Sequence, residues 1–123
     1  MSSLFPCFTY DRDILIAGGL CHDIGKVWEF DPDNLSRWKK NPRATGLPSL
    51  RHPGYGIYIC LTMGLPEEIA HIAAAHSGEG ELLVRSLENT MIHWADYTFW
   101  RVVEAGGQFA EEDPWDDASA GSA

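Results

Sequence analysis

The chain has 123 residues, a formal net charge of −9 and a hydrophobic fraction of 45% that includes five Trp. This length fits one compact domain, and the apolar content suffices for a core without disulfide bonds. The overall acidity argues against a duplex nucleic-acid binder, which relies on broad phosphate neutralisation. Because no apolar stretch approaches the roughly 20 residues of a membrane span and no secretory segment is evident, we expect a cytoplasmic protein without a membrane partner.

Charge is distributed unevenly along the chain. Five acidic residues lie between positions 111 and 117, and the Gly-, Ala- and Ser-rich composition around them predicts a disordered tail over residues 106–123, after a single domain of residues 1–105. Five of the nine basic residues lie in one segment: Arg37, Lys39, Lys40, Arg43 and Arg51. This segment is either an ordinary solvated surface or a means of steering a small anion or nucleotide. Three scattered cysteines (Cys7, Cys21 and Cys60) indicate reduced thiols.

The first predicted elements are a helix and a loop. Residues 11–22 have acids in the first turn and an apolar interior, which predicts a helix. Gly18 and Gly19 within it indicate close packing against another helix. Residues 27–51 contain Pro32, Pro42 and Pro48, which predict a long loop with one helical turn near residues 35–39. A loop of this length in a small domain usually covers something.

Three further helices are predicted. His52 and Pro53 are an N-cap and N1 pair that begins a helix ending at Gly64. Pro66 and two glutamates begin the next helix, which ends at Gly78. The last element covers roughly residues 80–105, with an apolar stripe at i, i+4 spacing that consists of Leu83, Leu87, Met91 and Ala95. Since no strand pattern is convincing, the expected fold is all-α.

The sequence "GGLCHDIGK" places His22 beside Asp23 at the end of the first predicted helix. One interpretation is a helix C-terminus, in which His22 complements the helix dipole. The other is part of a metal site. Consecutive helical residues diverge by about 100°, so the pair converges on one ion only where the helix ends, and Gly25 provides that end. A bridging Asp23 with histidines on either side would suit two ions about 3.5–4 Å apart.

The remaining histidines fall in three later segments. His52 begins one predicted helix, His71 and His76 share the next, and His93 precedes Asp96 by three residues on the last. Mixed imidazole and carboxylate ligands suit ions such as Zn, Mn and Fe. The pattern is therefore compatible with a metal site assembled from separated helices.

These segments resemble those of the HD-domain metal-dependent phosphohydrolase superfamily. "LIAGGLCHDIGK" is similar to its His-Asp signature, and "RHPGYG", "IAHIAAAHSGEGE" and "MIHWADYTFW" follow in the order and approximate spacing of the later metal-site segments. The pattern is most similar to the HD domain of bacterial 3′→5′ exoribonucleases and covers roughly residues 13–103. The resemblance implies a compact HD-domain helical bundle.

The resemblance also implies roles for individual residues. The implied metal ligands, for one or two divalent ions of Mn, Zn, Fe, Ni, Co or Mg, are His22, Asp23, His52, His76 and Asp96. Asp23 is the expected bridge, and Lys26 is a candidate catalytic residue that contacts a phosphate oxygen. We expect orientation roles at most for His71 and His93.

One feature of the family has no counterpart here. The family usually has a ligand histidine on a helix well before the doublet, whereas no histidine precedes His22. The site is reduced, or a partner chain supplies the helix, or the sequence is a shortened form. Since that helix would cover apolar surface, we expect a homodimer.

Three functions remain open. The first is a phosphohydrolase that cleaves a nucleotide or small phosphate ester with a metal-activated water. The second is an HD-fold metalloenzyme with non-phosphate chemistry, either a hydratase or lyase or an iron-dependent oxygenase. The third is a non-catalytic dimeric module, with an aromatic run that indicates core or dimer surface more strongly than a base-stacking platform: Trp94, Tyr97, Phe99 and Trp100. The sequence favours the first.

Overall fold

The computed structural model describes residues 8–107, so that the predicted tail lies outside the described residues except for its first two positions. Cys7 also lies outside them. Within residues 8–107 the elements are α1 (Arg12–Cys21), α2 (Lys26–Glu29), α3 (Pro32–Lys40), α4 (Pro42–Thr45), α5 (His52–Thr62), α6 (Glu67–Ala75), the 3₁₀ helix η1 (Gly78–Leu82) and α7 (Leu87–Ala105). These residues contain no strand, which confirms the all-α prediction.

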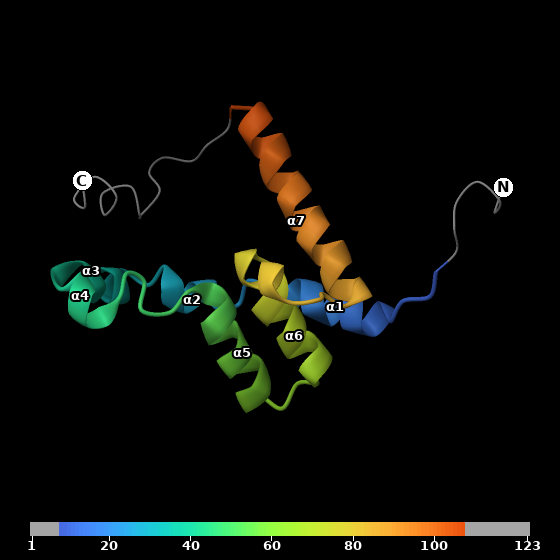
Figure 1. Cartoon of the computed structure of the whole chain (residues 1–123), viewed down its shortest axis with the longest axis horizontal. Helices are drawn as coiled ribbons and strands as arrows, with labels where there is room; N and C mark the ends of the chain where they lie inside the picture. Colours follow the sequence, from blue (N-terminus) through green and yellow to red (C-terminus); the bar gives the residue numbers. More distant parts are fainter. Residues whose placement is uncertain (1–7, 108–123) are drawn as a thin grey trace.

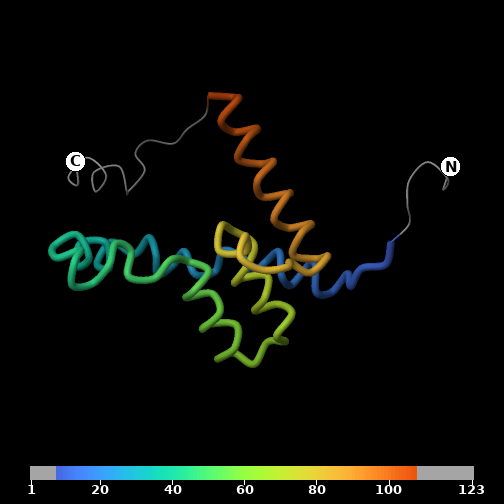
Figure 2. Tube along the Cα trace, in the orientation of Figure 1, coloured from blue at the N-terminus to red at the C-terminus, as the bar shows by residue number. Residues whose placement is uncertain are grey.

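Helix α6 lies at the centre of the bundle. It packs against α5 on one side and against α1 and α7 on others, and Figure 1 shows α5 and α6 as neighbouring antiparallel helices. The core there consists of Cys60, Ile69, Ala70 and Ala73, with Ile14, Ala17, Cys21 and Leu65 packed against it. The trace in Figure 2 shows α7 leaving this body, so that its C-terminal half projects from the bundle. No helix between residues 8 and 107 combines the length and apolar character that a membrane crossing requires.

Helix α1 begins and packs as its sequence predicts. Asp11 caps it, because its Oδ1 accepts a hydrogen bond from the Ile14 N–H at 3.0 Å. A Cβ atom at Gly18 would lie 2.2 Å from Ile72 Cδ1, so the glycine allows α1 to approach α6 closely. Gly19 has no such neighbour within 4 Å. The packing prediction therefore holds for the first glycine and is wrong for the second.

The prediction of a long loop after the His-Asp doublet is wrong, because the segment forms α2, α3 and α4; the helical turn predicted near residues 35–39 does lie within α3. Pro32 lies in the first turn of α3, where a missing N–H costs no hydrogen bond. Asp31 caps that helix by accepting the Asn34 N–H at 3.0 Å, and the fully buried Trp38 anchors it. Pro42 begins α4 in the same way. These prolines begin helices rather than break them.

Two later boundaries also differ from the prediction. His52 is the first residue of α5 and Arg51 is its N-cap, one residue before the predicted cap. The predicted helix over residues 80–105 is η1 followed by α7, which begins after Ser86, whose side chain accepts the Asn89 N–H. The predicted stripe is wrong, because α7 buries Asn89 and Ile92 against the bundle whereas Leu83 and Leu87 are exposed.

Candidate metal centre

The His-Asp doublet lies in the turn that follows α1. Backbone hydrogen bonds from the Ile24 N–H to the Cys21 carbonyl and from the Lys26 N–H to the Asp23 carbonyl hold this turn. A Cβ atom at Gly25 would lie 1.9 Å from the backbone oxygen of His52. A glycine is thus required for the turn to lie directly against the start of α5. This contact brings Asp23 to His52.

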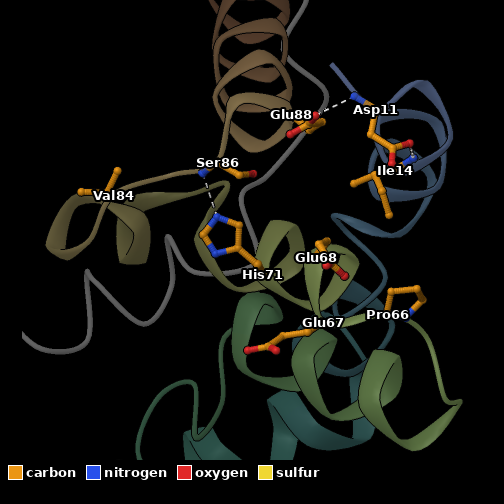
Figure 3. A pocket seen from close by; sticks show the side chains of 9 residues that line it. All are labelled: Asp11, Ile14, Pro66, Glu67, Glu68, His71, Val84, Ser86 and Glu88. Atoms are coloured by element: carbon orange, nitrogen blue, oxygen red, sulfur yellow. Dashed lines mark hydrogen bonds between the residues drawn. The ribbon is translucent and has the colours of Figure 1, made fainter. Parts of the chain in front are cut away.

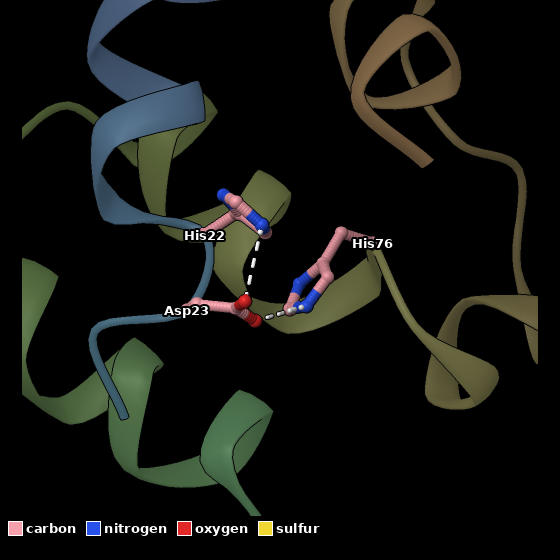
Figure 4. Close-up of side chains that lie close together, drawn as sticks. All are labelled: His22, Asp23 and His76. Carbon is pink, nitrogen blue, oxygen red and sulfur yellow. Dashed lines mark hydrogen bonds and ion pairs between the residues drawn. The ribbon is translucent and has the colours of Figure 1, made fainter. Parts of the chain in front are cut away.

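The Asp23 carboxylate lies between two groups of side chains. Its Oδ1 is 3.2 Å from His76 Nε2 and 3.5 Å from His52 Nε2, and those two nitrogens are 3.2 Å apart. Its Oδ2 is 3.3 Å from His22 Nε2 and 3.0 Å from Lys26 Nζ. Figure 4 shows the rings of His22 and His76 directed at this carboxylate from the ends of α1 and α6. Asp23 thus presents one oxygen to His52 and His76 and the other to His22, which is the position that a bridging carboxylate would take.

The other ring nitrogen of each histidine already faces a hydrogen-bond acceptor. His22 Nδ1 is 2.6 Å from the Gly19 carbonyl oxygen, and His76 Nδ1 is 3.1 Å from the Ala73 carbonyl oxygen. His52 Nδ1 is 2.5 Å from Glu29 Oε2. Each Nδ1 therefore donates, so that Nε2 of the neutral ring carries a lone pair.

These lone pairs converge on a negative carboxylate. The donor atoms of His22, Asp23 and His76 all lie within 4.8 Å of one another. Lone pairs and carboxylate oxygens at such distances repel unless a positive charge lies among them. Imidazole nitrogens and carboxylate oxygens are ligands for borderline divalent ions. The side chains present thus fit a cation site.

The pKa shifts have the same origin. Burial disfavours ionisation of Asp23, but its contacts with His22, His76 and Lys26 outweigh burial and hold its pKa far below the ordinary value. The contact with Asp23 raises the pKa of His22. Burial lowers the pKa of His52, although Glu29 opposes that shift. In the absence of an ion, hydrogen bonds from the neighbouring side chains stabilise the Asp23 carboxylate, as a bound cation would.

Asp96 completes the predicted ligand set. It reaches the centre from α7, where its Oδ1 lies 4.0 Å from His22 Nε2. This distance is longer than those that join His22, His52 and His76 to Asp23. The structure therefore connects all five residues through contacts with Asp23 or His22, although ligation by each of them stays a prediction.

Glu29 is a member of the centre that the sequence analysis did not identify. It is buried, and its Oε2 accepts hydrogen bonds from both Nδ1 and the backbone N–H of His52. Arg51 contacts its other oxygen at 3.7 Å and also pairs with Glu79. The sequence signal was weak, because Glu29 and His52 are 23 residues apart.

His71 serves the fold at a separate cavity of about 670 Å³ between the starts of α1, α6 and α7 (Figure 3). Its Nε2 accepts the Ser86 N–H at 3.0 Å and faces Asn89 Nδ2 at 3.2 Å, which fixes the start of α7. Four carboxylates also line this cavity: Asp11, Glu67, Glu68 and Glu88. None of the predicted ligands lines it.

His93 supports the end of α6. Its Nδ1 lies 2.7 Å from the backbone oxygen of His76 and donates to it. Both histidines, together with Asp96, line a second cavity of about 520 Å³ that adjoins the centre. This cavity gives a ligand access to the centre from the side of α7.

Comparison with known proteins agrees with this geometry. The family model described as the HD domain matches residues 8–100, a range that contains all the residues placed around Asp23. Comparisons with the curated proteins and with the solved structures find no match. HD-domain proteins bind divalent metals and are typically metal-dependent hydrolases. Since the match covers more than half of the chain, the protein belongs to the HD-domain family, within the metal-dependent phosphohydrolase superfamily.

Proposed function

We propose that the protein is a phosphohydrolase that cleaves a nucleotide or another small phosphate ester with a metal-activated water. The observation that supports this most is the convergence of three imidazole Nε2 lone pairs on the two oxygens of Asp23. Membership of the HD-domain family supports the same reaction class.

The proposed ion positions follow the two carboxylate oxygens. His52, His76 and Oδ1 of Asp23 would hold one divalent ion, and His22, Asp96 and Oδ2 would hold a second. The ligand types admit Mn, Zn, Fe, Ni, Co or Mg. When bound, such an ion lowers the pKa of a coordinated water toward about 7 and offsets negative charge on a phosphoryl group.

The chain itself would position and neutralise the substrate. Lys26 Nζ pairs with Asp23 Oδ2 and remains partly exposed, so it would contact a phosphate oxygen and balance its charge. The carbonyls of Gly19 and Ala73 and the carboxylate of Glu29 hold the three rings with Nε2 directed inward. These contacts keep the ligands in place before a substrate arrives.

The basic residues of segment 37–51 would attract a substrate only weakly, because Arg51, the one beside the centre, pairs with both Glu29 and Glu79. The other four lie on α3 and α4, which Figure 1 shows at one end of the molecule beside α2: Arg37, Lys39, Lys40 and Arg43. Their contribution would be a long-range field that salt screens.

Elemental analysis followed by a phosphate-ester panel tests the proposal. We expect bound divalent metal in the purified protein, and phosphate release that falls to background in Asp23→Ala. Equal background rates in both proteins would overturn the proposal. Two iron atoms per chain without hydrolysis would instead favour oxygen chemistry. Absence of metal, with function unaffected by His22→Ala, would favour an interaction module.

A further inference from the structure

The cavity beside the centre has an aromatic wall that hydrolysis alone does not require. Trp94, Tyr97 and Trp100 follow one another at i, i+3 spacing on one face of α7, and all three line the cavity. Their exposed fractions are 57%, 49% and 44%. Large rings usually bury most of their surface in a core or interface. We call these three residues the aromatic wall.

The aromatic wall is continuous with the candidate metal centre. His76 and Asp96 line the same cavity. The Trp100 ring centroid lies 5.9 Å from Lys26 Nζ, the group that pairs with Asp23. A substrate held with its phosphoryl group at Lys26 would therefore extend its remaining atoms along α7.

The wall is ordered before any ligand binds. Trp94 makes edge-to-face contacts with His93 at 5.0 Å and with Tyr97 at 5.7 Å between ring centroids. The Arg101 guanidinium lies 5.2 Å from the Tyr97 ring and also lines the cavity. A pre-positioned ring loses little conformational entropy when another ring stacks on it. Arg101 also pairs with Glu104, and Glu81 and Asp96 line the cavity too, so the positive charge for a phosphate would come from the side of Lys26 rather than from the aromatic wall.

We propose that the aromatic wall binds a planar aromatic ring in the leaving group of the substrate. The centre then prefers phosphate esters of nucleosides or aryl alcohols to those of sugars or aliphatic alcohols. This inference rests on the proposed phosphohydrolase function and narrows its substrate class. It differs from the expectation of a core or dimer surface, because these rings face a cavity shared with the centre.

Steady-state kinetics on two matched esters provides the test. Adenosine 5′-monophosphate and ribose 5-phosphate carry the same phosphorylated sugar, but only the first has an aromatic base that can stack. Stacking of a base on an aromatic side chain changes affinity by roughly five- to a hundredfold. We expect Trp94→Ala to raise KM for the nucleotide by about that factor and to leave KM for ribose 5-phosphate unchanged. Equal effects on both esters would overturn the inference.

Tyr58→Ala is the matched control, since this exposed aromatic residue lies on α5 and does not line the cavity. It should change neither KM. If wild type cleaves ribose 5-phosphate as well as the nucleotide, and Asp23→Ala abolishes both activities, the hydrolase proposal stands and the ring preference fails.

A binding measurement separates the wall from catalysis. Adenosine carries no phosphate, so it should quench the tryptophan fluorescence of the metal-loaded protein without being hydrolysed, whereas ribose should not. Quenching that Trp94→Ala weakens and Tyr58→Ala retains would support the wall even if no ester were cleaved. Absence of quenching in wild type would overturn it. Circular dichroism of each variant verifies that the fold is intact.

Discussion

The candidate metal centre has two halves that meet at Asp23. The buried half consists of Glu29, His52 and His76, whose side chains are 5%, 8% and 1% exposed. The open half consists of His22, Lys26 and Asp96, whose side chains are 22%, 36% and 29% exposed. Buried polar groups must be satisfied within the fold, whereas the open ones can exchange partners with solvent or ligand.

This difference separates folding from chemistry. The buried half lies where α2, α5 and α6 pack together, so any change there alters stability and metal binding together. The open half is accessible to solvent and its Asp96 lines the cavity beside α7, so it would determine which ligands reach a bound ion. Variants that affect one half alone provide the sharpest tests of this division.

The largest expected effect concerns the close approach that brings the two halves together. A Cβ atom at Gly25 would lie 1.9 Å from the backbone oxygen and 2.8 Å from Cα of His52. Since backbone atoms cannot rotate away, we expect Gly25→Ala to lower the free energy of unfolding by about 3 kcal/mol and to weaken metal binding. Urea denaturation of the metal-free and metal-loaded protein measures both effects.

Gly19→Ala is the matched control for that variant. Gly19 lies in α1 with nothing near its added Cβ atom, so alanine should raise the free energy of unfolding by up to about 1 kcal/mol. Similar stabilities of the two variants would show that the turn does not need its glycine.

The next effect tests the buried half alone. Glu29 accepts two hydrogen bonds from His52 and carries the charge that holds its ring in one tautomer. We expect Glu29→Gln to reduce zinc affinity by about 10- to 100-fold, the usual effect of losing a residue that orients a metal ligand. Competition against a chromophoric chelator measures this loss.

Glu79 offers a matched control on the same network. It pairs with Arg51, as Glu29 does, and no contact joins it to His52 among the described hydrogen bonds and ion pairs. Glu79→Gln should therefore leave zinc affinity within about twofold. An equal loss in the two variants would mean that Arg51, rather than the orientation of His52, governs affinity.

These residues also show how far the sequence predicts the structure. The helices that carry the histidines could be predicted because their caps and first turns are local signals, as Asp11 and Pro66 illustrate. The gathering of His22, Asp23, His52 and His76 could be predicted only through the resemblance, since they span 55 positions. The role of Glu29 could not be predicted, because no local sequence signal connects it to His52.

Two of the errors in secondary structure have a common physical cause. Pro32 and Pro42 were interpreted as helix breakers, yet each lies where a helix begins. The apolar spacing from Leu83 onward predicted a helix face, whereas the cap at Ser86 begins α7 later and tertiary packing buries Asn89 and Ile92. Spacing alone does not say where a periodic segment begins or which face packs.

A smaller effect concerns exposed apolar residues of α7 that lie outside the cavity. Phe99 and Val102 are 59% and 66% exposed on α7 and do not line the cavity. We propose that a second copy of the chain covers them, because large apolar side chains exposed together on one helix usually mark an interaction surface. Sedimentation should show a dimer that Phe99→Asp with Val102→Asp converts to a monomer. A wild-type monomer at all concentrations would contradict this.

The smallest expected effect is a difference between the pKa values of His22, in the open half of the centre, and His52, in the buried half. The pKa of His22 is raised by its contact with Asp23, and that of His52 is lowered by burial, both from an ordinary value of 6.5. In metal-free protein the ring signals of His22 should therefore titrate above pH 6.5 and those of His52 below it, as NMR measures.

The consequences for stability have opposite signs in the two halves. The stabilisation from His22 is complete below pH 6.5 and is lost as pH rises through its raised pKa, whereas His52 destabilises the fold as pH falls below 6.5. Because Glu29 opposes the shift of His52, Glu29→Gln should lower the His52 pKa further and leave that of His22 unchanged. If both rings titrated together, or if the variant moved both, the halves would be one coupled unit and the division at Asp23 would fail.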